Sequence, residues 1–184
     1  LAAAGSIAFS GKAIIVQLAY RHGVDAITLV MLRLLFAVPF FIAMAWWAGR
    51  GKLALTRADC LGVLGLGFSG YYLSSYLDFL GLQYISASFE RLILYLNPTL
   101  VLILGWVLYK RKITYRQAVA MAVSYSGVML VFGHEVSLVG ENVALGAMLV
   151  FGSAVSYAIY LSYSGQLVQR LGSLRLAGLA TTVA

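Results

Sequence analysis

Several ionisable side chains stand inside segments that are otherwise apolar, and they have the clearest capacity for chemistry. The set comprises Lys12, Arg33, Asp78, Glu90 and Arg91. An ionisable residue within a bilayer is costly, so it commonly faces a partner or a water-filled cavity and serves a function. The two carboxylates could exchange protons, because a buried carboxyl group holds its proton more readily than one in water. We interpret Lys12 as buried and Arg91 as extending towards the lipid headgroups.

Polar side chains also recur at helical spacing on three segments. Tyr71, Ser74, Ser75 and Asp78 form one stripe; Ser153, Ser156, Tyr157 and Tyr160 form a second; Glu90 and Asn97 share a third face. Side chains three, four or about seven residues apart lie on one face of a helix. Polar faces within a bilayer must meet one another or water. We therefore predict a hydrated pathway along these residues, with interhelical hydrogen bonding as the open alternative.

The Asn97-Pro98 pair predicts a break in the helix that carries Glu90. Proline lacks a backbone N–H, so the carbonyl group of Leu94 loses its helical partner. Broken helices beside a polar face are places where membrane transporters contact their substrates. Pro98 is therefore predicted to mark a helix break beside the polar pathway.

The composition requires an apolar environment for the elements that position these residues. The chain has 62% hydrophobic and 10% charged residues, with a mean hydropathy of +0.92. Soluble domains have roughly 45–50% apolar residues and about 25% charged residues. A membrane-spanning helix needs about 20 mostly apolar residues. We predict an all-α membrane protein, a bundle of transmembrane helices. The predicted spans are Leu1–Tyr20, Ala26–Ala48, Cys60–Leu82, Ser86–Tyr109, Gln117–Gly133 and Val143–Ser164, with a seventh beginning near Leu176.

The cations sort to one side of these predicted spans. They are Arg50, Lys52 and Arg57; Lys110, Arg111, Lys112 and Arg116; and Arg170 and Arg175. The alternate connections hold Arg21 with the acidic residues Asp25, Glu135 and Glu141. The positive-inside rule then predicts a multi-pass protein of the cell membrane with a cytoplasmic N-terminus. The same placement accounts for the net charge of +7 without a nucleic-acid partner.

Other motifs in the sequence do not predict a cofactor, a metal or a disulfide. Gly65, Gly67 and Gly70 spell G-x-G-x-x-G, but no strand precedes them, so we expect Gly62, Gly65 and Gly70 to let a neighbouring helix approach. His134, Glu135 and Glu141 lack the spacing of metal ligands. Cys60 is the single cysteine and has no disulfide partner within the chain.

The order of spans and several short motifs resemble the EamA family of the drug/metabolite transporter superfamily. The motifs are Phe9-Ser10-Gly11-Lys12, Leu32-Arg33, Tyr84-Ile85-Ser86-Ala87-Ser88, Asn97-Pro98, Ile113-Thr114 with Gln117, and Gly127-Val128. Two positions depart from the family pattern. Many members have Gly-Glu where this chain has Lys110-Arg111, and the usual glycine is replaced by Ala120.

The resemblance implies ten spans arranged as two inverted five-helix repeats. Residues 1–133 would then form the first repeat, and residues 134–184 would begin the second. The chain begins at Leu1, without methionine, and its last residues enter an apolar run. We expect it to be the first part of a longer protein.

These observations favour a secondary transporter, not an enzyme, that exports a small polar metabolite by alternating access. The five ionisable residues sum to +1, which suits an anionic or zwitterionic substrate such as an amino acid, and Asp78 and Glu90 would couple transport to protons. The expected partners are membrane lipid, the solute and a second copy in a homodimer. The alternatives are a membrane enzyme acting on lipid-linked substrates, which would need a catalytic cluster at a loop, and a non-transporting accessory subunit.

Overall fold

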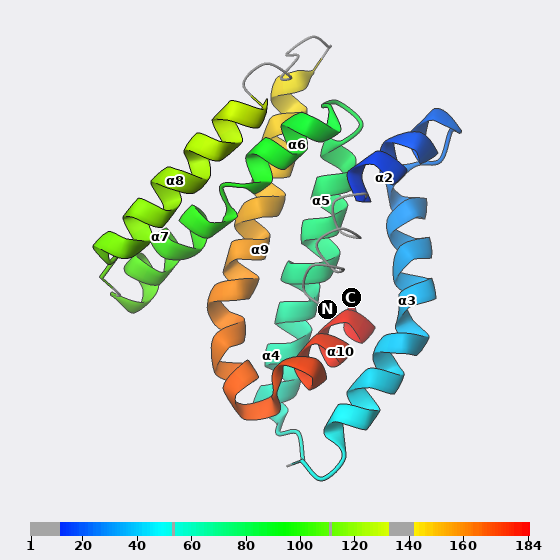
Figure 1. Ribbon diagram of the computed structural model, residues 1–184. Coiled ribbons are helices and arrows are strands. Elements are labelled where there is room, and N and C mark those ends of the chain that lie inside the picture. The colour runs from blue at the N-terminus through cyan, green and yellow to red at the C-terminus, as the bar shows by residue number, and fades with distance from the viewer. Residues whose placement is uncertain (1–11, 53, 111, 133–141) are drawn as a thin grey trace.

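The computed structural model describes residues 12–52, 54–110, 112–132 and 142–184, and every regular element in this part of the chain is helical (Figure 1). The helices are α2 (Lys12–Arg21), α3 (Ala26–Gly49), α4 (Arg57–Gly67), the π-helix η1 (Phe68–Leu73), α5 (Ser74–Gly81), α6 (Ala87–Leu94), α7 (Asn97–Tyr109), α8 (Tyr115–Phe132), α9 (Val143–Leu171) and α10 (Ser173–Val183).

The helices follow the predicted spans closely. α3 matches the second span, α4, η1 and α5 together match the third, and α6 with α7 matches the fourth with its break at Tyr95 and Leu96. By length and composition, residues 26–49, 87–109 and 143–171 are long and apolar enough to cross a membrane. The prediction of an all-α multi-span membrane protein is confirmed in the described residues.

Two predicted boundaries were wrong at the end of the sixth span. α9 continues past Ser164 to Leu171, and α10 begins at Ser173, ahead of Leu176. Gln166 and Gln169 are polar but good helix formers, so the helix outlasts its apolar stretch. It ends where Gly172 adopts a φ of 86°, which favours glycine. Arg170 and Arg175 therefore lie on helices and not in a connecting loop.

Local capping sets where the helices begin. The Asp25 side chain accepts a hydrogen bond from the Thr28 N–H at the start of α3, and Ser86 accepts one from Phe89 at the start of α6. At α4, Thr56 and Asp59 form a reciprocal capping box. Such caps satisfy N–H groups that the helix leaves without partners.

Close packing around α9 uses small residues. α9 packs against α5 on one side and α7 on another, and α10 crosses back against α3 (Figure 1). A Cβ added to Gly81 would lie 2.5 Å from Val150 Cγ2, and one added to Gly146 would lie 2.7 Å from Tyr84 Cβ. Small residues let membrane helices approach closely where no hydrophobic force drives their association.

Gly62 and the glycines of the G-x-G-x-x-G motif partly follow the prediction of close helix contacts. A Cβ on Gly62 would lie 2.9 Å from Leu167 Cδ2, and one on Gly70 would lie 2.4 Å from Tyr160 Cγ. Gly65 meets nothing within 4 Å among the described residues, which corrects its assignment to a helix contact. Gly67 makes the approach instead, because its Cβ would lie 2.5 Å from the carbonyl oxygen of Ala180.

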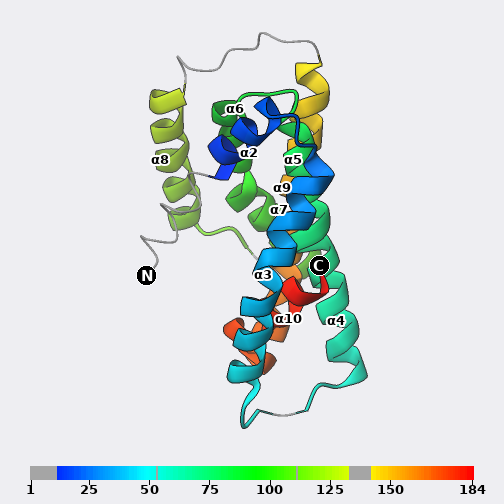
Figure 2. The same cartoon turned by 90° about the vertical axis from the view of Figure 1, so that its right-hand side faces the viewer.

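Large apolar side chains cover the outside of the bundle. Phe36 is 73% exposed and Phe40 is 77% exposed on α3, and Leu130 on α8 is 83% exposed. Figure 2 shows α8 set apart from α3, with α9 and α10 nearer to α3. Lipid can cover such a surface, whereas exposing these apolar side chains to water would cost free energy. The predicted repeat boundary at residues 133 and 134, together with Glu135, Glu141 and Arg111, lies outside the described residues.

Candidate functional site: a buried charge cluster

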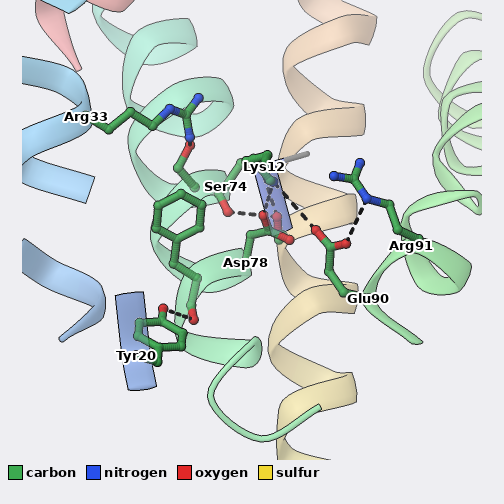
Figure 3. A network of polar contacts seen from close by, with 10 residues as sticks. Lys12, Tyr20, Arg33, Ser74, Asp78, Glu90 and Arg91 are labelled. Carbon is green, nitrogen blue, oxygen red and sulfur yellow. Dashed lines mark hydrogen bonds and ion pairs between the residues drawn. The ribbon is translucent and has the colours of Figure 1, made fainter. Parts of the chain in front are cut away.

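Four of the ionisable residues predicted from sequence come together between α2, α5 and α6 (Figure 3). Lys12 Nζ forms an ion pair with Asp78 Oδ2 and lies 3.6 Å from Glu90 Oε1. Arg91 Nε lies 3.3 Å from Glu90 Oε2, which corrects the prediction that Arg91 extends towards the lipid headgroups. The Glu90 side chain has no exposed surface, and the Asp78 side chain is 4% exposed. We call these four residues, Lys12, Asp78, Glu90 and Arg91, the charge cluster.

The helices place the two carboxylates in opposite local fields. Glu90 stands in the first turn of α6, where the partial positive charge of the helix N-terminus favours an anion. Asp78 stands in the last turn of α5, where the helix C-terminus disfavours one. Asp78 therefore depends more on its ion pair with Lys12, which α2 brings across the bundle.

Arg33 reaches the same region through an aromatic ring. The Lys12 Nζ atom and the Arg33 guanidinium carbon each lie 5.6 Å from the centroid of the Phe79 ring. Arg33 Nη1 donates a hydrogen bond of 3.3 Å to Ser75 Oγ. Tyr20 donates to the Phe79 carbonyl oxygen at 2.6 Å, which joins the C-terminal end of α2 to α5 (Figure 3). The Phe79 ring thus makes cation–π contacts with both Lys12 and Arg33.

Three carboxylate oxygens of the cluster have unused hydrogen-bonding capacity. Asp78 Oδ1 and both oxygens of Glu90 are buried and accept no hydrogen bond from the described residues, although Glu90 makes the ion pairs given above. Burying a charge is costly unless it is paired and hydrogen-bonded. These atoms can therefore accept a proton, or a donor group on a solute.

The polar stripes of the third and sixth predicted spans face each other below the cluster. Ser153 Oγ donates to the Ser74 carbonyl oxygen at 2.7 Å, and Ser156 Oγ donates to the Ser69 carbonyl oxygen at 2.8 Å. The hydroxyl groups of Tyr71 and Tyr160 lie 3.2 Å apart. In this conformation the stripes make interhelical hydrogen bonds, which is the alternative that the sequence left open.

Tyr157 extends this polar zone, whereas Asn97 stands apart. The Tyr157 and Tyr160 rings stack with centroids 5.5 Å apart. Asn97 begins α7, and its buried Oδ1 atom accepts no hydrogen bond from the described residues. Within the described residues, neither carboxylate oxygen of Glu90 accepts a hydrogen bond from Asn97. Pro98 lies in the first turn of α7, where its missing N–H costs nothing.

The π-helix η1 was not predicted from the sequence. The Ser74 N–H reaches the Ser69 carbonyl oxygen five residues earlier, and the segment carries Gly70 and Tyr71 against α9. Single π turns inside α-helices are often found at functional sites. The sequence signal is Gly67 just before η1 and Gly70 within it, and these glycines also suit close helix packing.

A third buried carboxylate, outside the charge cluster, was not predicted from the sequence. Asp59 lies at the start of α4, and its Oδ2 atom is 3.2 Å from Arg170 Nη2 at the end of α9. Hydrogen bonds from the Thr56 backbone and hydroxyl, followed by the charges of Arg170 and Arg175, hold the pKa of Asp59 below its usual value. Asp59 follows Arg57 in a segment read only for its cations, so its partner on a distant helix was not foreseen.

Apolar helices that enclose ion pairs between distant segments are the organisation of a multi-pass membrane transporter. The model of the EamA-like transporter family matches residues 1–133. This chain belongs to the EamA-like transporter family.

Curated relatives are also described as transporters. YcbK of Bacillus subtilis (strain 168), an uncharacterized transporter, is 30% identical over 184 residues, which are 98% of this chain and 58% of that protein. YyaM of the same organism, also an uncharacterized transporter, is 29% identical over 128 residues, covering 68% of this chain and 42% of that protein. An uncharacterized transporter of Archaeoglobus fulgidus is 26% identical over 66% of this chain and 41% of its own length. The chain thus spans about half the length of these relatives. No solved structure matches it.

Proposed function

We propose that the full-length protein is a secondary transporter of a small polar solute and that the charge cluster binds protons and solute in turn. The observation that carries this proposal is Glu90, a fully buried carboxylate placed between Lys12 and Arg91. A purely structural helix bundle gains little from buried charges, because apolar residues of similar volume pack there at lower cost. Their presence inside apolar helices favours a functional role.

Lys12 can link the two carboxylates to a transport cycle. It pairs with Asp78 and lies near Glu90, so protonation of one carboxylate leaves the ammonium group free to pair with the other. Because Lys12, Asp78 and Glu90 come from three different helices, such a change of partner would alter how α2, α5 and α6 fit together. That exchange is a physical route from proton binding to alternating access.

The charges of the site favour an anionic or zwitterionic solute. Lys12, Arg33 and Arg91 supply three cations against the two carboxylates of Asp78 and Glu90. A solute carboxylate would meet the cations, and a solute ammonium group would meet an unused oxygen of Asp78 or Glu90. An amino-acid-like metabolite satisfies both, and we propose export from the cytoplasm as the direction. A homodimer in the plasma membrane belongs to the same proposal.

Transport driven by a pH gradient in proteoliposomes tests the coupling role. Asp78→Asn and Glu90→Gln each remove one proton site while keeping the side-chain shape, and we expect either change to reduce pH-driven flux of amino acids by about tenfold or more. Asp25→Asn is the matched control, because Asp25 is an exposed cap that asparagine can replace. If both cluster variants transport as well as the control, the coupling proposal is wrong.

A further inference from the structure

Phe79 provides the buried ring on which two cations of this region converge. It stands on α5 directly after Asp78 and is 2% exposed. Lys12 Nζ and the Arg33 guanidinium carbon each lie 5.6 Å from the ring centroid. Figure 3 shows these two cationic side chains reaching the region from different helices. Phe79 was not among the residues predicted from the sequence, although it contacts both cations.

The surroundings of the ring strengthen such contacts. The apolar residues that form a buried cluster with Phe79 are Val16, Ala26, Val30 and Leu82. The face of an aromatic ring is negative because of the quadrupole of its π-system. The attraction between this face and a cation is larger where water is excluded. The apolar cluster therefore favours the contacts of the ring with Lys12 and Arg33.

A hydrogen bond fixes the backbone of Phe79 to the helix that carries Lys12. Tyr20 Oη donates to the Phe79 carbonyl oxygen at 2.6 Å. This carbonyl group lies in the last turn of α5, where a helix leaves carbonyl groups without intrahelical partners. Lys12 and Tyr20 both belong to α2. The N-terminal end of α2 therefore contacts the Phe79 ring, and its C-terminal end contacts the Phe79 backbone.

The ammonium group of Lys12 reaches three groups from one position. It pairs with Asp78, lies 3.6 Å from Glu90 Oε1 and lies over the Phe79 ring. A carboxylate loses its charge when it binds a proton, whereas the ring keeps its quadrupole. Of these three contacts, the one with the ring is therefore constant.

We propose that Phe79 is a positioning residue that keeps Lys12 and Arg33 at the charge cluster whether Asp78 is charged or protonated. With Lys12 held over the ring, an exchange of its ion-pair partner between Asp78 and Glu90 needs only a small movement of the ammonium group. Arg33 is held on the same ring, so both cations stay together for the anionic group of a solute. This consequence rests on the proposed function, but the contacts of the ring can be tested without transport.

A competing explanation treats Phe79 only as an apolar side chain that fills the core. In that case the size and shape of the ring matter, and its electron density does not. Fluorine atoms distinguish the two explanations, because they withdraw electron density from the ring face and change the shape only slightly. A ring that only fills the core should leave the protein as stable as before, whereas a ring that binds cations should lose stability with each fluorine.

Thermal unfolding of the full-length protein in detergent tests the proposal, with phenylalanine analogues that carry one, two or three fluorine atoms at position 79. We expect the Tm to fall by about 1–2 °C for each fluorine. The matched control is the same series at Phe89, which is also a sequence neighbour of a cluster carboxylate but packs against the apolar Ile93 and Val150. That series should leave the Tm nearly constant. A constant Tm at position 79, or an equal fall at both positions, would overturn the proposal.

Two further variants assign the effect to the cations. Arg33→Met leaves Lys12 as the remaining cation of the two, so the fall in Tm per fluorine should be about half as steep. Asp78→Asn imitates the protonated carboxyl group, and the slope there should equal that of wild type, because Lys12 stays over the ring. Each variant is compared with its own unfluorinated form, so a lower starting stability does not affect the slope. An unchanged slope in Arg33→Met, or a halved slope in Asp78→Asn, would contradict the proposed positioning role.

Transport kinetics in proteoliposomes separate this inference from the proposed function. Three fluorine atoms on Phe79 should raise the KM for an amino acid by about threefold or more and leave the maximal rate nearly unchanged, because the cations that bind the solute are held less firmly. An unchanged KM together with a falling Tm would show that the ring has only a structural role. Absence of amino-acid flux in wild type would refute the proposed solute, and the fluorine series in detergent would still decide whether the ring holds the cations.

Discussion

Glu90 illustrates how single residues in this protein depend on one another. Its carboxylate lies between Lys12 and Arg91 and has no exposed surface. Lys12 in turn pairs with Asp78, so each carboxylate relies on a cation that another helix or turn supplies. Removing one member of a buried ion pair leaves an uncompensated charge, whereas neutralising both members avoids that cost. The cluster should therefore respond to substitution as a unit.

Lys12→Met should lower the free energy of unfolding by about 3–5 kcal/mol, because it leaves Asp78 and Glu90 facing each other without their shared cation. The double variant Lys12→Met/Asp78→Asn removes one carboxylate charge and should recover part of that loss. Urea or thermal unfolding in detergent measures both. Equal stability of the single and double variants would mean that the ion pair is not the source of the effect.

Asp59 should make stability depend on acid pH. Its pKa is lowered in the folded protein, mainly by hydrogen bonds from Thr56 and less by Arg170, relative to about 3.9 in the unfolded chain. The stabilisation is therefore complete above the unfolded pKa and is lost as pH falls through the folded pKa. As pH falls from about 5 towards the folded pKa, the Tm of wild type should fall more steeply than that of Asp59→Asn. Arg170→Ala should keep most of the wild-type slope; a flat slope there would contradict the ranking of causes.

At the scale of elements, apolar length and polar spacing were enough to predict the helices and the break before Asn97. They were not enough for η1, where Gly70 lies against Tyr160 of a helix far away in the sequence. Spacing placed Ser74 and Ser75 on one stripe, but only the rotation of α5 sends Ser74 to α9 and Ser75 to Arg33. The transport roles of these residues stay predictions.

Glycine-to-alanine substitutions can distinguish glycines in close helix contacts from a glycine with open space around it. Gly67→Ala and Gly70→Ala place a Cβ 2.5 Å from the Ala180 carbonyl oxygen and 2.4 Å from Tyr160 Cγ, and each should destabilise the protein by about 1–3 kcal/mol through overpacking. Gly65→Ala is the matched control, since a Cβ there meets nothing within 4 Å among the described residues. It should be neutral or stabilising by up to about 1 kcal/mol. Thermal unfolding in one detergent compares them, and a control as unstable as Gly70→Ala would refute this packing argument.

The whole molecule separates a cationic end from an end with few cations. Arg50 and Arg57 flank the connection between α3 and α4, and Arg170 and Arg175 flank the one between α9 and α10. The charge cluster lies at the C-terminal end of α5, beside the connection that leads to α6 and away from the cationic end. If the protein moves a solute as proposed, a solute entering from the cationic end would cross the zone of Ser74, Ser153 and the tyrosines before it reached Glu90.

The same separation predicts the orientation of the molecule in the membrane, and cysteine labelling can test that prediction. In a Cys60→Ala background, Glu141→Cys should react with a membrane-impermeant maleimide added to intact cells, because the positive-inside rule places residues 135–141 outside. Lys112→Cys should react only after the cells are permeabilised, because it belongs to the cation-rich connection between α7 and α8. Both variants keep the other cations, so the distribution of Lys and Arg that sets orientation is nearly unchanged. Labelling of Lys112→Cys but not of Glu141→Cys in intact cells would show that the orientation is opposite to the prediction. The proposed direction of export would then lose its support.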